Sequence, residues 1–184
     1  MHSTSAAPVH SITYRREPLL KHIVQLAVAD DGYVYVGANL DDCVLMLPSS
    51  LEVCSVLYGA TPTLKGIAVH ADTLFVLQRS FERDVDQVHV YDRNNGEPLT
   101  QYALSDVYYA VSMFLCAGSG MAPLLAIGCI PEDDRTFDVK LITLEGTHVR
   151  TVTAWPRMTE VGFDAAANEL VFAVTGIIPW SVLV

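Results

Sequence analysis

The side chains that could do chemistry in this sequence stand mainly at expected turns. Four acidic clusters are present: Asp30 with Asp31, Asp41 with Asp42, Asp84 with Asp86, and Glu132 with Asp133 and Asp134. A Ca²⁺ site would need several such oxygen ligands converging on one point. Aspartate is also favoured at turns, where it hydrogen bonds to the local backbone, and no Asp-x-Asp-x-Asp-Gly loop occurs. We therefore interpret the clusters as turns and expect no metal site.

Histidine and serine provide the other candidate catalytic groups. His70 would need a carboxylate or a second histidine to orient it as a base or metal ligand, and the sequence shows no such partner. His89 is expected to face solvent from a strand, and His148 is expected in a turn. Gly118-Ser119-Gly120 lacks the Gly-x-Ser-x-Gly pattern of a hydrolase elbow, and Gly-rich phosphate loops are absent. We expect no catalytic residue and no cofactor.

A second group of residues is suited to recognition. The segment 78–86 is longer than a tight hairpin, and long loops on a rigid scaffold often carry binding residues. Aromatic residues and arginine are enriched in the cores of protein interfaces. The residues that fit this description are Arg79, Phe81, Arg83, Tyr108, Tyr109 and Trp180. The alternative, that the aromatic side chains fill gaps between packed sheets, stays open.

Composition limits the partners and the location. The 184 residues are 51% hydrophobic and 17% charged, which excludes intrinsic disorder. The net charge of −10 opposes a phosphate-binding surface, so nucleic acid is not an expected partner. No apolar run reaches the roughly 18 residues of a membrane span, and residues 1–22 lack the apolar core of a signal peptide. We expect an intracellular, cytoplasmic protein whose four cysteines, Cys43, Cys54, Cys116 and Cys129, are small buried residues.

Short apolar strands must position all of these residues. Runs rich in Val, Ile, Leu, Tyr and Phe alternate with turn clusters such as residues 30–32 and 94–96. No window has the apolar spacing of an amphipathic helix with a capping residue before it. The predicted fold class is therefore all-β.

These strands recur as a repeat. Residues 26–36 align with residues 67–76 at an offset of 41, and a weaker copy covers residues 161–174. A period of roughly 40 to 50 residues is typical of a β-propeller. Each unit has two apolar strands followed by two partly exposed strands, as the inner and outer strands of a blade would be. We predict a β-propeller of about four four-stranded blades, or a partial propeller completed by oligomerisation or by a missing segment.

The predicted blades cover residues 23–59, 64–105, 109–155 and 158–184, of which the last is incomplete. Its third strand, residues 177–184, would leave an apolar edge exposed, which natural β-proteins avoid. The N-terminal segment 1–22 could supply a closing strand through residues 9–15. A partner chain or a continuation of the chain is the alternative.

The second unit resembles the NHL repeat. Its Gly66-Ile-Ala-Val start, its Leu-Phe-Val76 strand and its Gln87-Val-His-Val-Tyr-Asp92 strand match the pattern of that family in order. The other units each keep only half of the pattern, and members of this broad class mostly have six blades. The resemblance implies a binding platform for proteins and sometimes RNA, whereas related six-bladed enzymes hydrolyse lactones or esters around a central Ca²⁺.

From these observations we expect a non-enzymatic propeller scaffold. It would bind a protein partner, or associate with itself, through a loop face or an exposed blade edge. A metal-dependent lactonase- or esterase-like hydrolase and an RNA-binding propeller are the alternatives, because the fold by itself does not determine the function.

Overall fold

The computed structural model describes residues 13–14, 23–38, 43–48, 54–58, 63–80, 84–104, 107, 109–132, 136–154, 158–174 and 180–183. Every regular element in this part of the chain is a β-strand, which confirms the predicted all-β class. No helix within it is long and apolar enough to cross a membrane.

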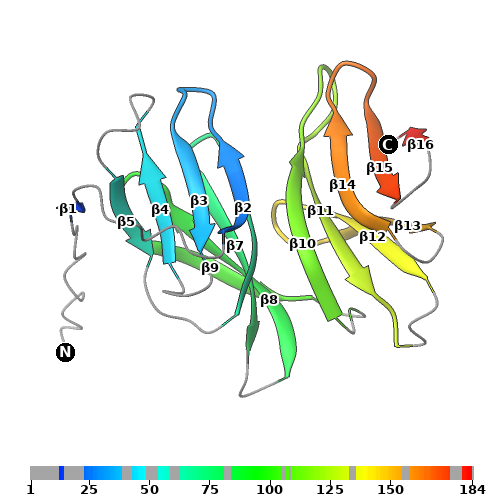
Figure 1. Ribbon diagram of the computed structural model, residues 1–184, viewed down its shortest axis with the longest axis horizontal. Coiled ribbons are helices and arrows are strands. Elements are labelled where there is room, and N and C mark those ends of the chain that lie inside the picture. The colour runs from blue at the N-terminus through cyan, green and yellow to red at the C-terminus, as the bar shows by residue number, and fades with distance from the viewer. Residues whose placement is uncertain are drawn as a thin grey trace.

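The strands form four antiparallel sheets, which we number blades 1 to 4 in chain order (Figure 1). Blade 1 contains β2 (Ile23–Val28), β3 (Val34–Ala38), β4 (Cys43–Leu47) and β5 (Cys54–Tyr58), with β1 (Thr13–Tyr14) at its edge. Blade 2 contains β6 (Leu64–His70), β7 (Thr73–Ser80), β8 (Val85–Asp92) and β9 (Pro98–Ala103). Blade 3 contains β10 (Tyr109–Cys116), β11 (Leu124–Ile130), β12 (Phe137–Thr143) and β13 (His148–Ala154). Blade 4 contains β14 (Met158–Asp164), β15 (Glu169–Val174) and β16 (Trp180–Leu183).

The first strand of each blade lies against the first strand of the next. Strand β2 contacts β6, β6 contacts β10, and β10 contacts β14. The strands that follow lead outward in chain order within each blade, as Figure 1 shows for β10 to β13. This is the arrangement of propeller blades around an axis, and it confirms the predicted fold class.

The hydrophobic core lies between the blades. Tyr35 and Val44 of blade 1 share a buried cluster with Ile67 of blade 2. Phe75 of blade 2 belongs to the cluster that includes Leu125 and other residues of blade 3. Blade 2 is therefore covered by apolar side chains on both faces near the axis, while its outer strand β9 is exposed along most of its length.

Burial of the first strands follows the prediction in blade 2 and departs from it in blade 1. Strand β6 is buried at every position but its last. In β2, by contrast, Ile23, Leu26 and Val28 are exposed. The expectation that the first strand of every unit is covered on both faces is thus wrong for β2.

One irregularity recurs at the same place in all four blades. The first strand carries a β-bulge, where it contains one residue more than its partner strand, near its start. The bulges lie between Ile23 and Gln25, Leu64 and Gly66, Ala110 and Ser112, and Met158 and Glu160. A bulge bends its strand and changes the direction of nearby side chains. The inserted residues are Val24, Lys65, Val111 and Thr159.

Gln25 joins three inner strands next to these bulges. Its side-chain oxygen accepts a hydrogen bond of 3.1 Å from the backbone N–H of Ile67, and its side-chain nitrogen donates to the backbone oxygen of Met113. Gly66 makes this close approach possible, because a Cβ at that position would lie 2.7 Å from the backbone nitrogen of Met113. Gln25 and Gly66 therefore lie where the inner strands β2, β6 and β10 meet.

The N-terminal pairing differs from the expected one. Thr13 and Tyr14 pair with Ser55 and Cys54 of β5, so β1 extends the outer edge of blade 1 and does not lie beside β16. An edge strand offers unpaired backbone groups to any nearby extended segment, and β5 provides such an edge. The rest of segment 1–22 lies outside the described residues.

Candidate functional site

Two of the predicted recognition residues meet in space. Arg79 lies near the end of β7 and Tyr109 begins β10, and their side chains are in contact. Phe81, Arg83 and Tyr108 lie outside the described residues, and of Trp180 only its place at the start of β16 is described.

The long loop expected over residues 78–86 is mostly strand. Strand β7 continues to Ser80, β8 starts at Val85, and Arg79 is paired with Asp86 across the ladder. Polar side chains are compatible with these positions because opposite charges face each other across the strands. Arg79 is therefore held by a sheet.

Five residues form what we call the anchor cluster: Lys65, Arg79, Asp84, Asp86 and Tyr109. Tyr109 is its exposed aromatic member, with 43% of its surface accessible. The Lys65 ammonium lies 3.6 Å from the ring centroid, and the central carbon of the Arg79 guanidinium lies 5.4 Å from it. Cations at such distances are attracted to the face of an aromatic ring. The two cations thus fix the position of the ring.

Asp86 forms ion pairs with both Lys65 and Arg79. It is fully buried, with Oδ1 2.9 Å from Lys65 Nζ and Oδ2 3.6 Å from Arg79 Nη1. Oδ2 also accepts a 2.6 Å hydrogen bond from the backbone N–H of Ala110 in the next blade. The interpretation of Asp86 as a turn residue is therefore wrong, because its charge is neutralised inside the sheet.

Asp84 is the turn residue of the pair. Its side chain is 84% exposed, its φ is +52°, and its Oδ1 accepts hydrogen bonds from Arg79 Nη2 at 2.6 Å and Nε at 3.0 Å. These contacts raise the pKa of Arg79 above its ordinary value. The guanidinium is held between a buried carboxylate and an exposed one.

Lys65 is placed to support the ring. It is 9% exposed, and burial lowers its pKa from the ordinary value while the Asp86 carboxylate opposes that shift. A nucleophilic amine would need an open approach, and here Tyr109 covers the nitrogen. The anchor cluster therefore presents the Tyr109 ring and the Asp84 carboxylate to solvent, with Arg79 partly exposed between them.

Sequence reasoning missed Lys65, although a signal was present. At the offset of 41 residues it aligns with Val24, and the inserted residues of the other two bulges are Val111 and Thr159. A lysine where the other units carry uncharged residues marks a local departure from the repeat. The charge of Lys65 at this position of the repeat indicates a site particular to blade 2.

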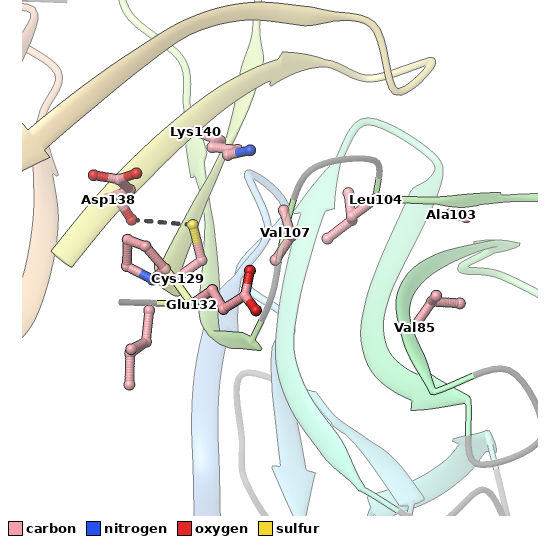
Figure 2. Close-up of a pocket in the computed structure, with 10 residues that line it drawn as sticks. Val85, Ala103, Leu104, Val107, Cys129, Glu132, Asp138 and Lys140 are labelled. Atoms are coloured by element: carbon pink, nitrogen blue, oxygen red, sulfur yellow. Dashed lines mark hydrogen bonds between the residues drawn. The ribbon is translucent and has the colours of Figure 1, made fainter. Parts of the chain in front are cut away.

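A cavity of about 570 Å³ opens between blades 2 and 3 beside the anchor cluster (Figure 2). Leu104 and Val107 line one side, and Cys129 and Lys140 line the other, with Glu132 at its margin. Its volume falls in the range of small-molecule pockets. Because Tyr109 is paired with Ile130, which also lines the cavity, the exposed ring and the cavity are neighbours.

Burial holds the thiol in this cavity in its protonated form at neutral pH. Burial raises the pKa of Cys129 to about 11 and that of Cys116 to about 12, whereas nucleophilic cysteines have depressed values. Cys129 donates a 3.4 Å hydrogen bond to the backbone oxygen of Asp138. Both cysteines are free and buried, as predicted, while the side chains of Cys43 and Cys54 lie outside the described part.

The histidines occupy three different environments. His89 is half-buried in β8, which corrects the expectation that it faces solvent, and its Nε2 lies 2.7 Å from the side-chain nitrogen of Gln78. His148 begins β13, so its expected place in a turn is also wrong. His70 ends β6 and is partly exposed. Within the described ranges, no group of three or more His, Cys, Asp or Glu side chains is placed to hold a metal ion.

Of the other acidic clusters, Asp30, Asp31 and Glu132 lie in turns, as predicted, and Asp41, Asp42, Asp133 and Asp134 lie outside the described residues. Two further aspartates also stabilise turns, since Asp92 accepts a hydrogen bond from the backbone N–H of Asn94 at 2.8 Å and Asp164 accepts one from Ala166 at 2.9 Å. Asp31 caps its own turn and also pairs with Arg93 of blade 2 at 2.6 Å, which lowers the Asp31 pKa. These carboxylates stabilise turns and blade contacts.

Comparisons with known proteins bear on the fold. No family model matches the sequence, and no curated protein matches it. The chain is similar to a chain of the nidogen/laminin complex, with a TM-score of 0.63, 15% identity, and coverage of 83% of this chain and 56% of that one. It is similar to the Dos1 propeller, with a TM-score of 0.57, 17% identity, and coverage of 82% and 40%. It is also similar to the computationally designed Ika4 protein, with a TM-score of 0.55, 14% identity, and coverage of 92% and 99%.

The chain thus spans about half of the nidogen/laminin chain and less of Dos1, but nearly all of the designed protein. At these identities the likeness concerns the fold alone. Together with the four sheets and the contacts between their inner strands, it shows that this chain is built as a β-propeller.

Proposed function

We propose that this chain is a binding module, a propeller scaffold that recognises a protein partner through the end of blades 2 and 3 that carries the anchor cluster. The observation that carries the proposal is the exposed Tyr109 ring, held in place by Lys65 and Arg79. The pattern of residues 66–99 supports a relation to NHL-type repeats, for which protein binding is the usual implication.

The anchor cluster has the properties of an interface hot spot. Tyrosine and arginine contribute strongly to binding energy when they are central in an interface. Ordering a long side chain on binding costs free energy, and Asp84 and Asp86 have already ordered Arg79. A partner that covers Tyr109 and Arg79 therefore meets a surface that is organised in advance.

The adjoining cavity favours a partner with an apolar side chain next to basic residues. Its walls include Val85, Leu104 and Ile130, and Glu132 adds a carboxylate. The net charge of −10 favours encounter with a basic surface. We infer that an apolar side chain enters the cavity while a neighbouring cation approaches Glu132.

A photocrosslinking experiment tests this function. The photoreactive amino acid p-benzoylphenylalanine is introduced at Tyr109, and at Leu99 as a control, since Leu99 is a 58% exposed apolar residue of the outer strand β9. A protein captured from position 109 and not from position 99 is then purified and its Kd is measured. Arg79→Ala and Tyr109→Ala should each weaken binding about 10-fold or more. Equal capture at both positions, or a Kd unchanged in both variants, would contradict the proposal.

A further inference from the structure

Blade 1 has an uncovered apolar face on its inner strand. Ile23, Leu26 and Val28 of β2 are 48%, 56% and 67% exposed. The residues 41 positions later, which occupy the same places in β6, are Leu64, Ile67 and Val69. They are 2%, 0% and 6% exposed. The same positions of the repeat are therefore buried in blade 2 and open in blade 1.

The packing of blade 2 shows what such a face receives. Leu64, Ile67 and Val69 are covered by blade 1, which contributes Tyr35 and Val44 to the shared cluster. Each first strand thus turns this face toward the preceding blade. In blade 1 the neighbouring residues of β3 and β4, such as Val36 and Leu45, are buried. The exposed apolar surface of blade 1 is therefore confined to β2.

The opposite face of blade 4 is open at Gly162. Gly162 of β14 is exposed, and a Cβ at this position would meet no atom within 4 Å. Counted from the bulge, Gly162 is equivalent to Ala68 of β6, which is 2% exposed and shares a cluster with Met113 of blade 3. The described blades therefore form an arc. Within the described residues, β2 at one end of the arc and β14 at the other each lack a neighbour on one side.

We propose that these two faces meet between two copies of this chain. Blade 4 of one copy packs on β2 of the other, so that Gly162 lies against Leu26 as Ala68 lies near Met113. Because one copy carries both faces, the contact forms twice and a two-fold dimer closes into a single ring. Apolar residues exposed to this extent on a strand of the core are a typical sign of an interface.

The length of a similar chain supports a second copy as the occupant. The matched part of this chain covers 56% of the nidogen/laminin chain, so two copies together supply about the length of that chain. The likeness to the designed Ika4 protein, which is matched over 99% of its length, supplies the competing possibility of a ring formed within one chain. The dimer surface is separate from the anchor cluster, which lies on β6, β7, β8 and β10.

Disulfide trapping separates these two arrangements. In the Leu26→Cys, Gly162→Cys double variant, mild oxidation should produce a covalent dimer on a non-reducing gel, and each single variant should not. A disulfide within one chain, seen as a monomer of altered mobility, would overturn the proposal, as would failure to crosslink.

Light scattering on the unmodified chain gives an independent measurement. The expected mass is that of two 20.1 kDa chains, and Leu26→Asp with Val28→Asp should reduce it to one. Leu99→Asp and Val149→Asp, at exposed apolar positions of outer strands, should leave the dimer intact. A monomeric wild-type chain at 100 μM would overturn the proposal, and so would a dimer that survives both aspartates. Circular dichroism confirms that each variant is folded, and partner binding by Tyr109 is scored separately.

Discussion

Asp86 is the residue on which the anchor cluster depends most. It is buried with two cations and one backbone N–H as partners, so removing its charge leaves Lys65 buried beside an uncharged side chain. Asp86→Asn should lower the free energy of unfolding by roughly 3 to 5 kcal/mol, as measured for broken buried ion pairs.

Asp84→Asn is the matched control for that measurement. Its carboxylate also binds Arg79 but is 84% exposed, and exposed ion pairs contribute roughly 0 to 1 kcal/mol. Urea denaturation of both variants should separate them clearly. Equal losses would show that Asp86 is not the support of the cluster.

His89 gives the molecule a defined dependence on pH. Burial lowers its pKa from the ordinary 6.5, and its Nε2 lies 2.7 Å from the side-chain nitrogen of Gln78 and 3.3 Å from the side-chain oxygen of Gln87. The folded state therefore holds the neutral ring, while the unfolded chain gains a proton as the pH falls below about 6.5. Stability contributed by His89 is complete above that pH and decreases toward the lower folded pKa.

His89→Gln should remove this contribution. Thermal melts at pH 7.5 and pH 5.5 should show a smaller loss of stability on acidification in His89→Gln than in the wild type. His148→Gln, on the exposed strand β13, should retain the wild-type loss. An unchanged pH dependence in His89→Gln would contradict the assignment.

At this scale the sequence predicted types of residue and missed their contacts. Arg79 and Tyr109 were selected because interfaces favour arginine and tyrosine. Their contact could not be predicted, because they are far apart in the chain and meet only where two blades pack. Lys65 and Asp86 are charged residues that can be buried only because they pair with each other. That pair exists only in the packed sheets, so the sequence does not reveal it.

The inner strands approach each other closely enough to need glycine at one position. In Gly66→Ala the added methyl would lie 2.7 Å from the Met113 nitrogen and 2.9 Å from Gln25 Oε1. We expect a loss of roughly 1 to 3 kcal/mol, typical of overpacking, measured by urea denaturation.

Gly162→Ala is the matched variant in β14. Nothing lies within 4 Å of the position that its added methyl would take, and the equivalent Ala68 shows that the repeat accepts alanine there. We expect stability to be unchanged or slightly increased. If both glycine variants behaved alike, the close approach of β6 and β10 would not be the cause.

Strand positions were predicted well where clusters of Gly, Asn and Asp mark the turns between strands. The predicted turn clusters at residues 30–32 and 94–96 separate β2 from β3 and β8 from β9. The prediction of a loop around Arg79 is wrong because charged residues are typical of loops, and here they pair across two strands. Alternation alone could not show that Arg79 and Asp86 face each other.

The whole molecule is held together by contacts between successive blades. If two copies close the ring, assembly and folding are linked, and the melting temperature rises with protein concentration. We expect a measurable increase in Tm between 1 and 100 μM for the wild-type chain. The Leu26→Asp, Val28→Asp variant should show a lower Tm that does not depend on concentration.

The number of blades could be predicted from the sequence, while closure could not. The 41-residue offset reveals the units because each buries the same pattern of side chains. Closure depends on how closely successive blades pack, as at Gly66 and Gln25, and the length of a repeat does not encode this packing.

The recurring bulge has a consequence for how such a chain can grow. Since every first strand is bent at the equivalent position, an added unit would meet blade 1 in the geometry in which blade 1 meets blade 2. A tandem duplication that placed a copy of residues 64–103 ahead of β2 would cover Leu26 and expose a new Leu-Ile-Val triplet one unit earlier. Such a chain would be longer by one blade and would still present the same apolar surface at its first strand.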